Sequence, residues 1–428
     1  MTMHGICTMH DQRDSVPTEN LVPGEVAALR RPARIPASGL ERAALGRFLN
    51  LIGKPDLSVR LWDGSEVHSG RPPRVEASIA DRTALWRLML NPSLCFGEEY
   101  SSGGIEVEGD LAAFMRAILR ARPAALDSRF PLARLLHRSI NDLSGSRENI
   151  HHHYDIGNSF YALWLDKEMA YTCAYYPEPG TALESAQFAK FDLVCRKLNL
   201  QANETVVEAG CGWGGLARHM ARHYGVKVKA YNISREQIAY CRERARREGL
   251  DDRIEYIEDD YRNIRGQFDA FVSVGMLEHV GMENLPALGR VIDNCLRPHG
   301  RGLIHTIGQH RGEPLGGWIA RHIFPGAYPP TLGEMQTIFE PRFTVLDVEN
   351  LRAHYAQTCL QWLARFDEHV DQVRAMFDEN FVRAWRLYLA SSHASFAEGE
   401  LQLFQVVFSR PRGYQPPWTR AHLYGARA

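Results

Sequence analysis

The sequence lacks several features that would assign it to a familiar class of protein. No uninterrupted apolar run reaches the roughly 18 residues that a membrane-spanning helix needs. The eight cysteines form no CxxC pair, which argues against a zinc site and a disulfide framework. With 50 basic and 51 acidic residues, the formal net charge is −1, so no overall positive field would attract nucleic acid. We therefore expect neither a nucleic-acid partner nor a bound metal.

The start of the chain also lacks the apolar segment of a signal peptide, because it carries His, Asp, Arg and Glu side chains instead. Together with the cysteine pattern, this predicts a reduced, cytoplasmic protein that contacts the inner face of the membrane only peripherally. Residues 1–40 are rich in proline, arginine and polar residues and predict a flexible arm, although 21–29 could form a short helix. The remaining length is enough for two domains.

Residues 41–120 predict a small α+β domain. The segment 57–62 alternates like a strand, and Asp63-Gly64 is a hairpin signal. Asp81 is expected to cap a helix, and Asp110 the next one. Between these helices, we expect the glycine-punctuated segment 97–109 to form a loop and a strand.

Residues 121–150 predict a basic linker. Arginines that begin before it at Arg116 and continue to Arg138 outnumber a single acid, Asp127, and apolar residues are interleaved with them. This combination suits contact with an anionic bilayer surface. An ordinary amphipathic helix pair with a solvated face is an equally good interpretation.

The segment VVEAGCGWGG at 206–215 predicts a strand, a tight turn and the start of a helix. Glycines remove the Cβ atom, so the backbone can come close to a nucleotide-like ligand. Gly210, Gly212 and Gly215 even match the dinucleotide fingerprint, which alone is a weak signal. A turn used only for packing is the alternative.

The residues around this turn favour S-adenosylmethionine over a nicotinamide cofactor. The next expected strand, 226–230, ends in Tyr231-Asn232 and lacks the acid that would bind a ribose. Glu208 stands before the first glycine, and Trp213 lies inside the turn. We therefore expect an S-adenosylmethionine site here.

From residue 151 to 428, alternating helix and strand patterns predict an α/β methyltransferase domain with a doubly wound, parallel, Rossmann-like sheet. An insertion at about 308–400, rich in aromatic residues and helical patterns, is expected to lie over the carboxyl ends of the strands. Glu278 and His305 each follow or end a strand, so they should converge in the same crevice as the glycine turn. The strands are expected at 226–230, 254–257, 270–274, 302–306 and 403–408, with helices at 234–248 and 285–296.

Several short motifs, in this order, resemble the cyclopropane-fatty-acid synthase family, which includes the mycolic acid cyclopropane synthases. The resemblance covers roughly residues 149–410. More loosely, the domain at 41–120 resembles the lipid-delivery region of longer family members, which implies that this domain contacts lipid or membrane. The motifs are HYDIGN at 153–158, YTCAYY at 171–176, GCGWGG at 210–215, ISREQ at 233–237, DYR at 260–262, the segments around Glu278 and His305, IFPG at 323–326, HY at 354–355 and QVVFSR at 405–410.

The resemblance implies transfer of the methyl carbon of S-adenosylmethionine to a cis double bond of an unsaturated phospholipid acyl chain. A carbocation forms, a base removes a proton from the new methyl group, and a cyclopropane ring closes. Family members hold a bicarbonate ion as that base, and they form dimers, so a homodimer is expected. The residues that match the bicarbonate site are Cys173, Glu278, His305 and Tyr355, with the backbone of Ile307.

The resemblance also assigns cofactor contacts, with three departures. Family members often have Asp where this chain has Glu208, and Thr where it has Asn232. The mycolic-acid branch of the family tends to have Trp where this chain has Tyr261. The candidate cofactor-binding residues are Tyr171, Thr172, Glu208, Gly210, Gly212, Gly214, Asn232, Ile233, Gln237 and Tyr261.

Each of these residues also has a purely structural interpretation. Cys173 is a candidate for a small buried hydrophobe, Glu278 for a helix cap, and His305 for a satisfied core histidine. Tyr355 and Tyr261 would be packing aromatics, and Gln237 a solvated helix residue. The functional alternatives are a methyl- or methylene-branched fatty acid as product, a small soluble methyl acceptor, and a non-catalytic binding protein.

Overall fold

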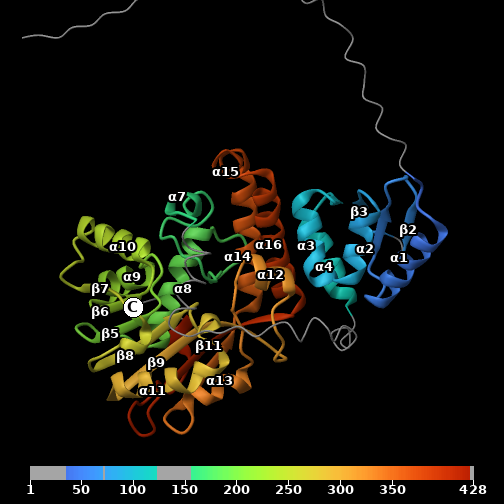
Figure 1. Ribbon diagram of the computed structural model, residues 1–428. Helices are drawn as coiled ribbons and strands as arrows, with labels where there is room; N and C mark the ends of the chain where they lie inside the picture. Colours follow the sequence, from blue (N-terminus) through green and yellow to red (C-terminus); the bar gives the residue numbers. More distant parts are fainter. Residues whose placement is uncertain (1–34, 71–72, 123–155, 425–428) are drawn as a thin grey trace, which may run out of the picture. The chain divides into compact units, whose positions relative to one another are not determined.

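The computed structural model describes residues 35–70, 73–122 and 156–424 (Figure 1). Most of the arm expected at 1–40, including the helix considered at 21–29, therefore lies outside the described residues. The same holds for almost all of the basic linker and for the start of the HYDIGN motif. Within the described ranges, no helix is both long enough and apolar enough to span a membrane.

The N-terminal part contains a four-stranded sheet in the order β2-β1-β3-β4. Its first two strands form the expected antiparallel hairpin, and the Asp63 carboxylate accepts a hydrogen bond from the Ser65 N–H in the turn. Asp81 and Asp110 cap the two helices predicted for them, accepting from Ala84 N–H at 2.9 Å and Ala112 N–H at 2.8 Å. The elements are α1 (Gly39–Leu51), β1 (Leu57–Arg60), β2 (Glu66–His68), β3 (Val75–Ile79), α2 (Arg82–Leu90), α3 (Pro92–Ser102), β4 (Ile105–Glu108) and α4 (Leu111–Ala121).

The loop expected from residue 97 is wrong in its first half, because helix α3 continues through Gly97 to Ser102. This glycine is not a turn residue. A Cβ atom placed on it would lie 2.3 Å from the indole of Trp318 on α12 (Gly317–His322), so glycine is required for the packing of α12 against α3. Helix α3 ends at Ser102, and the next residue, Gly103, is its C-cap and has the left-handed conformation.

The main sheet has seven strands in the order β10-β11-β9-β8-β5-β6-β7. Its core, β9-β8-β5-β6-β7, is parallel, as expected. However, β11 runs antiparallel to β9, and β10 runs antiparallel to β11. The strands are β5 (Thr205–Ala209), β6 (Lys227–Asn232), β7 (Ile254–Glu258), β8 (Phe268–Val274), β9 (Leu296–Gln309), β10 (Thr344–Asn350) and β11 (Leu401–Ser409).

Strand β10 corrects the interpretation of 308–400 as a helical insertion. It is an edge strand in which every side chain is half-buried or exposed and none is fully buried, so its apolar signal is weak. Strand β9 is also longer than the expected 302–306 and begins at Leu296, which had been assigned to the preceding helix.

Both faces of the main sheet are covered by helices, which fits the doubly wound prediction. Neighbouring strand residues alternate between two cores: Val206 packs with one and Val207 with the other. The first core includes residues of α8 (Leu183–Lys197), α9 (Gly215–Tyr224) and α10 (Arg235–Arg247). The second includes residues of α11 (Leu285–Cys295) and α13 (Leu332–Phe339).

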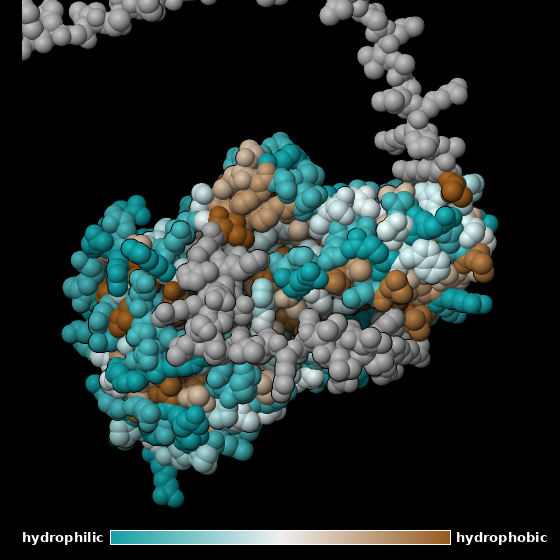
Figure 2. Space-filling model, viewed as in Figure 1, coloured by the Kyte–Doolittle hydropathy of each residue, from teal (hydrophilic) through white to brown (hydrophobic). Residues whose placement is uncertain are grey.

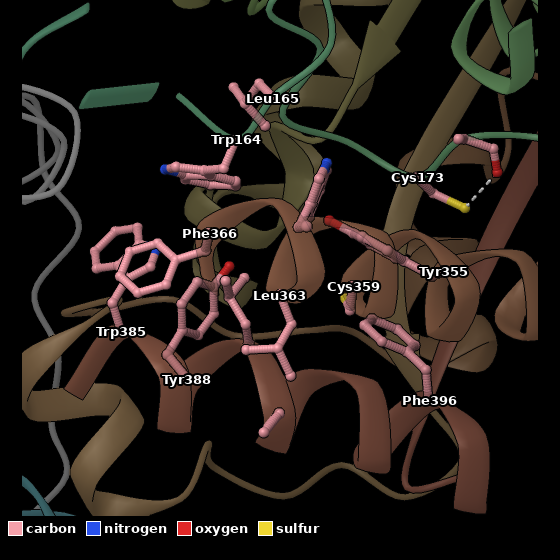
Figure 3. Close-up of a cluster of buried hydrophobic side chains, with 14 of the residues drawn as sticks. Trp164, Leu165, Cys173, Tyr355, Cys359, Leu363, Phe366, Trp385, Tyr388 and Phe396 are labelled. Carbon is pink, nitrogen blue, oxygen red and sulfur yellow. Dashed lines mark hydrogen bonds between the residues drawn. The ribbon is translucent and has the colours of Figure 1, made fainter. Parts of the chain in front are cut away.

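A third core cluster joins helices from distant parts of the sequence. It is rich in aromatic residues and includes Trp164, Tyr355, Trp362, Trp385 and Phe396 (Figure 3). Its main helices are α7 (Asn158–Tyr161), α14 (Arg352–Glu368) and α16 (Glu379–Glu398), with α15 (Val370–Met376) between the last two. Three short 3₁₀ turns, η2 (Tyr261–Asn263), η3 (Leu277–His279) and η4 (Met282–Asn284), and helix α17 (Ala421–Tyr424) complete the described elements.

Candidate active site

The glycine turn leaves β5 and enters α9 as predicted. Gly210, Gly212 and Gly214 have φ values of +81°, +52° and +74°, a region that side chains with a Cβ atom disfavour. The turn is fixed to the next strand because the N–H groups of Gly210 and Cys211 both donate to the Tyr231 carbonyl, at 2.9 and 3.0 Å. The backbone of this turn is therefore held in one conformation.

These glycines serve two different purposes. A Cβ atom on Gly210 would lie 2.9 Å from Met276 Cβ, and one on Gly214 would lie 2.5 Å from the Tyr256 hydroxyl. In contrast, a Cβ atom on Gly212 would meet no atom within 4 Å. Packing explains the first two glycines, but Gly212 faces open space, where a ligand can approach the backbone.

The end of β6 contacts the same turn. The Asn232 side-chain amide donates to the Gly212 carbonyl at 3.2 Å and to Gln237 Oε1 at 2.7 Å. Gln237 is buried, so its interpretation as a solvated helix residue is wrong. Its Nε2 group and the buried Tyr261 hydroxyl have no hydrogen-bond partner among the described residues. Ile233 follows Asn232 directly and is half-buried.

Glu208 lies on β5 just before the turn and is 2% exposed. Burial raises the pKa of its carboxyl to about 8, and the nearby charges of Lys190 and Arg218 oppose this shift. Its Oε2 atom has no hydrogen-bond partner among the described residues. An unsatisfied carboxyl next to a glycine turn suits a cationic ligand group.

Lys190 on α8 was not predicted as a site residue. It is 1% exposed, and its Nζ donates to Thr172 Oγ1 at 2.9 Å. The sequence did carry a signal, because this lysine occupies the apolar face of a helix that packs on the sheet. A buried lysine is rare enough to suggest a function.

Glu278 lies in η3, shortly after the end of β8. Its Oε1 accepts a hydrogen bond from the Ile307 N–H at 2.5 Å. The side chain does not cap η3, so the interpretation of Glu278 as a helix cap is wrong. Its Oε2 has no hydrogen-bond partner among the described residues, and burial raises the pKa of this carboxyl to about 7.

His305 lies on β9, directly opposite Gln405 on β11. The Gln405 side-chain amide lies 3.0 Å from His305 Nδ1, and both residues are buried. Burial and the charges of Lys190 and Lys197 lower the pKa of His305 well below its ordinary value, so the ring is neutral. Since the amide nitrogen can only donate, Nδ1 accepts and the ring proton is on Nε2. That Nε2 atom has no hydrogen-bond partner among the described residues, which contradicts a fully satisfied core histidine.

Cys173 and Tyr355, both labelled in Figure 3, are linked through the carbonyl of Leu351, which directly precedes α14. The fully buried Cys173 thiol donates to the Ala174 carbonyl at 3.1 Å and, more weakly, to the Leu351 carbonyl at 3.9 Å. The Tyr355 N–H donates to that same Leu351 carbonyl at 3.2 Å. Burial raises the pKa of both Cys173 and Tyr355 well above the ordinary value, so both side chains are protonated donors.

Comparison with known proteins identifies the family. A family model described as mycolic acid cyclopropane synthetase matches residues 141–406, which is more than half of the chain. The chain belongs to this family. A second model, of a domain of unknown function, matches residues 45–129.

Individual relatives of the family match over most of their length. A probable fatty acid methyltransferase of Pseudomonas putida is 37% identical over 384 residues, which cover 86% of this chain and 96% of the relative. The cyclopropane-fatty-acyl-phospholipid synthase of Escherichia coli strain K12 is 38% identical over 333 residues, covering 76% and 85%. The crystal structure of a mycolic acid cyclopropane synthase complexed with SAH and CTAB has a TM-score of 0.59 and 28% identity, covering 61% and 97%. The protein is therefore an S-adenosylmethionine-dependent methyltransferase.

The structure fits that cofactor. Open space beside Gly212 lets an adenosyl group approach the backbone, and Gln237 and Tyr261 offer buried donors without a partner among the described residues. No group of three or more His, Cys, Asp or Glu side chains that would hold a metal occurs in the described part of the chain.

Proposed function

We propose that this member of the cyclopropane synthase family transfers the methyl carbon of S-adenosylmethionine to a cis double bond of an unsaturated phospholipid acyl chain and forms a cyclopropane ring. The observation that carries the proposal is the pair of buried, unsatisfied polar atoms Glu278 Oε2 and His305 Nε2. An acceptor and a donor of this kind suit a small anion that both accepts and donates hydrogen bonds. A base is required, because ring closure releases a proton.

Bicarbonate is the base that we propose. The residues that would hold it are Glu278, His305, Cys173 and Tyr355, with the backbone of Ile307. When bound, it would accept the proton released from the new methyl group. The ionisation states favour this assignment, since the neutral His305 ring offers an Nε2–H group and burial keeps the Tyr355 hydroxyl protonated.

The aromatic residues near these groups suit a reaction that passes through a carbocation. Tyr171, proposed as a cofactor contact, lies 5.3 Å from the rings of both Trp164 and Trp362. Aromatic faces stabilise positive charge by their quadrupoles. Both tryptophans are fully buried, so this wall also excludes water, which would otherwise add to the cation.

The alternative product is a methyl- or methylene-branched fatty acid. It shares the methyl transfer step and differs in the fate of the cation. The relative from Pseudomonas putida carries the broader name of fatty acid methyltransferase, which leaves this alternative open for related chains. The complete set of Cys173, Glu278, His305 and Tyr355 favours the ring.

The deciding experiment is proton NMR of phospholipid isolated from cells that express this protein and supply monounsaturated chains. Mass spectrometry alone is insufficient, since a ring and a methylene branch add the same atoms. High-field cyclopropane methylene signals would establish the ring, whereas vinylidene or methyl-branch signals would assign the alternative. Absence of any new lipid, with cofactor binding intact, would argue against both acyl products and leave a different methyl acceptor or a non-catalytic binding protein.

On the family resemblance, we further propose that the protein is a homodimer. We also propose that the substrate is taken from an anionic membrane surface. Large apolar side chains are exposed in the N-terminal domain, with Leu40 at 82% and Leu90 at 77% exposure. In Figure 2, separate hydrophobic patches lie over the region of α1 and α2. Such side chains suit shallow insertion into a bilayer.

The arginines of the basic linker are the proposed electrostatic part of that surface, and they lie outside the described residues. Replacing Arg129, Arg134 and Arg138 with Ser should weaken binding to vesicles of anionic phospholipid, and the loss should shrink as salt is added. Unchanged vesicle binding at low salt would assign the membrane contact to another surface.

A further inference from the structure

Lys190 makes few contacts for a buried charge. Its ammonium donates to Thr172 Oγ1 at 2.9 Å, and it also lies 4.1 Å from the centre of the Phe191 ring. In the described ranges, no carboxylate oxygen lies within 4 Å of it. A buried ammonium with a single hydrogen bond carries a large desolvation cost, so a purely structural role would favour replacement by an apolar residue.

The hydrogen bond between Lys190 and Thr172 can run in only one direction. An ammonium has three donors and no acceptor, so the Thr172 hydroxyl must accept from Lys190. The hydrogen of that hydroxyl is consequently available to donate elsewhere. A nearby positive charge also makes the hydroxyl a stronger donor toward an anion.

Other contacts fix the orientation of Thr172. Gln187, one turn earlier on α8, donates its side-chain amide to the Thr172 carbonyl at 2.8 Å and to the Ala170 carbonyl at 3.1 Å. The Thr172 methyl group packs on Gly275, where an added Cβ atom would lie 2.7 Å away. Backbone and methyl are therefore both held, and only the hydroxyl is left to contact a ligand.

Glu208 is one of the charged groups that act on Lys190. Burial lowers the pKa of Lys190 to about 8, and the charges of Asp166, Cys173 and Glu208 oppose this shift. Glu208 precedes the glycine turn and has an unsatisfied oxygen, and no ion pair closer than 4 Å joins it to Lys190 among the described residues. Lys190 and Glu208 are thus a buried cation and a buried carboxyl that do not contact each other. Such a pair suits a ligand group that carries both a carboxylate and an ammonium.

We propose that Lys190 is a positioning residue for the amino-acid end of S-adenosylmethionine: it directs the Thr172 hydroxyl to donate to the α-carboxylate, while Glu208 receives the α-ammonium. This inference rests on the proposed assignment of Thr172 and Glu208 as cofactor contacts. Beyond that assignment, it gives Lys190 a role that is exerted through Thr172. It also predicts that the site prefers ligands that carry the α-carboxylate.

The test compares two ligands by calorimetry on the full chain. S-adenosylhomocysteine carries the amino-acid end, and 5′-methylthioadenosine lacks it. Lys190→Met should weaken binding of S-adenosylhomocysteine about 10- to 100-fold, the usual effect of losing a charge-assisted hydrogen bond, and change methylthioadenosine binding less than about twofold. Thr172→Val should produce the same selectivity, and the two substitutions combined should cost no more than either alone.

Lys197 provides a matched control, since it is a second buried lysine on α8 and is paired with Glu349 at 2.5 Å. Lys197→Met should not distinguish the two ligands. Equal weakening of both ligands by Lys190→Met would overturn the inference, because it would indicate a general structural role. If Lys190→Met does not fold, Lys190→Gln replaces it: this variant retains a donor without the charge, and unchanged ligand preference would overturn the inference.

The same data separate this inference from the proposed function. If Thr172→Val leaves S-adenosylhomocysteine binding unchanged, the assignment of Thr172 to the cofactor is wrong. If Thr172→Val weakens binding selectively but Lys190→Met does not, the cofactor assignment stands and the role of Lys190 is wrong.

Discussion

Glu278 Oε1 lies 2.5 Å from the backbone nitrogen of Ile307, beyond the point where β8 ends at Val274. Strand β9 continues past the end of β8, so the Ile307 N–H on that side would otherwise lack a hydrogen-bond partner. The Glu278 carboxylate takes the place of the backbone carbonyl that a longer β8 would supply. This arrangement orients the side chain rigidly and leaves its second oxygen for a ligand.

We expect Glu278→Gln to reduce turnover about 10²- to 10⁴-fold, in the range of general acid–base contributions. The amide retains an oxygen for the Ile307 N–H but lacks the negative charge proposed to organise the base. Affinity for S-adenosylhomocysteine should change little, because the cofactor residues are separate. Steady-state rates with vesicle substrate and calorimetry measure the two quantities.

The exposed Glu283 in the following turn η4 gives the control, and Glu283→Gln should retain normal turnover. Turnover by Glu278→Gln at the wild-type rate would remove this residue from the mechanism.

Glu278 should also make stability depend on pH. Burial raises its pKa from 4.5 to about 7, so the folded state binds the proton more tightly than the unfolded chain. The stabilisation is complete below pH 4.5 and is lost as the pH rises through about 7, amounting to about 3 kcal/mol. Glu278→Gln has no carboxyl to titrate, so it does not lose stability in this way. Its melting temperature relative to that of the wild type should therefore rise between pH 5 and pH 8. Parallel pH curves for the two proteins would contradict the expectation.

The glycine turn allows a paired prediction. Gly214→Ala should destabilise the fold, because its Cβ atom would enter the space of the Tyr256 hydroxyl and the φ of +74° is unfavourable. Gly212→Ala meets open space and should cost only the backbone strain of about 1 kcal/mol. It should nevertheless weaken S-adenosylhomocysteine binding by at least about tenfold. Thermal melting and calorimetry separate these effects, and normal binding by folded Gly212→Ala would exclude close approach of the cofactor.

Gln405 should control the tautomer of His305. A carboxylate at this position accepts from Nδ1–H, so Gln405→Glu should move the ring proton from Nε2 to Nδ1 and remove the donor proposed for bicarbonate. We expect the bicarbonate concentration for half-maximal activity to rise about 10- to 100-fold. Nitrogen-15 NMR of histidine-labelled protein, with His305→Gln to assign the signal, reports the tautomer.

Gln402 lies on the same strand and donates its amide to the Gly399 carbonyl at 2.7 Å. Gln402→Glu therefore adds the same charge away from His305 and should leave bicarbonate dependence unchanged. An Nδ1–H tautomer in the wild-type protein would disprove the role of Gln405.

Sequence patterns predicted most of the parallel core because its signals are local. The turn at 206–215 and the caps Asp81 and Asp110 each depend on neighbours within a few residues. The half-exposed strand β10 has no comparable periodic signal, since its place depends on pairing with β11, more than fifty residues later. Gly97 was misread for the same reason, as its partner Trp318 is far away in sequence.

The candidate site divides in the same way. The family resemblance selected Glu278 and His305, and it included Gln405 in the motif QVVFSR without giving it a role. Lys190 carried a signal only as a lysine on the apolar face of a helix, and nothing in the sequence pairs it with Thr172. Only the fold reveals that the polar atoms of Gln405 and Lys190 are buried against Nδ1 of His305 and the hydroxyl of Thr172.

Strand β11 is the last strand in the described part of the chain, yet it lies between β9 and β10 and carries the partner of His305. During synthesis on a ribosome, the glycine turn is made roughly 190 residues before β11, and β9 is complete roughly 90 residues before it. A nascent chain can therefore fold its cofactor turn before β11 is available to pair with the edge of β9. The base-holding half of the site is complete only after β11 has been made, so chains that end before β11 should bind the cofactor without possessing a competent catalytic centre.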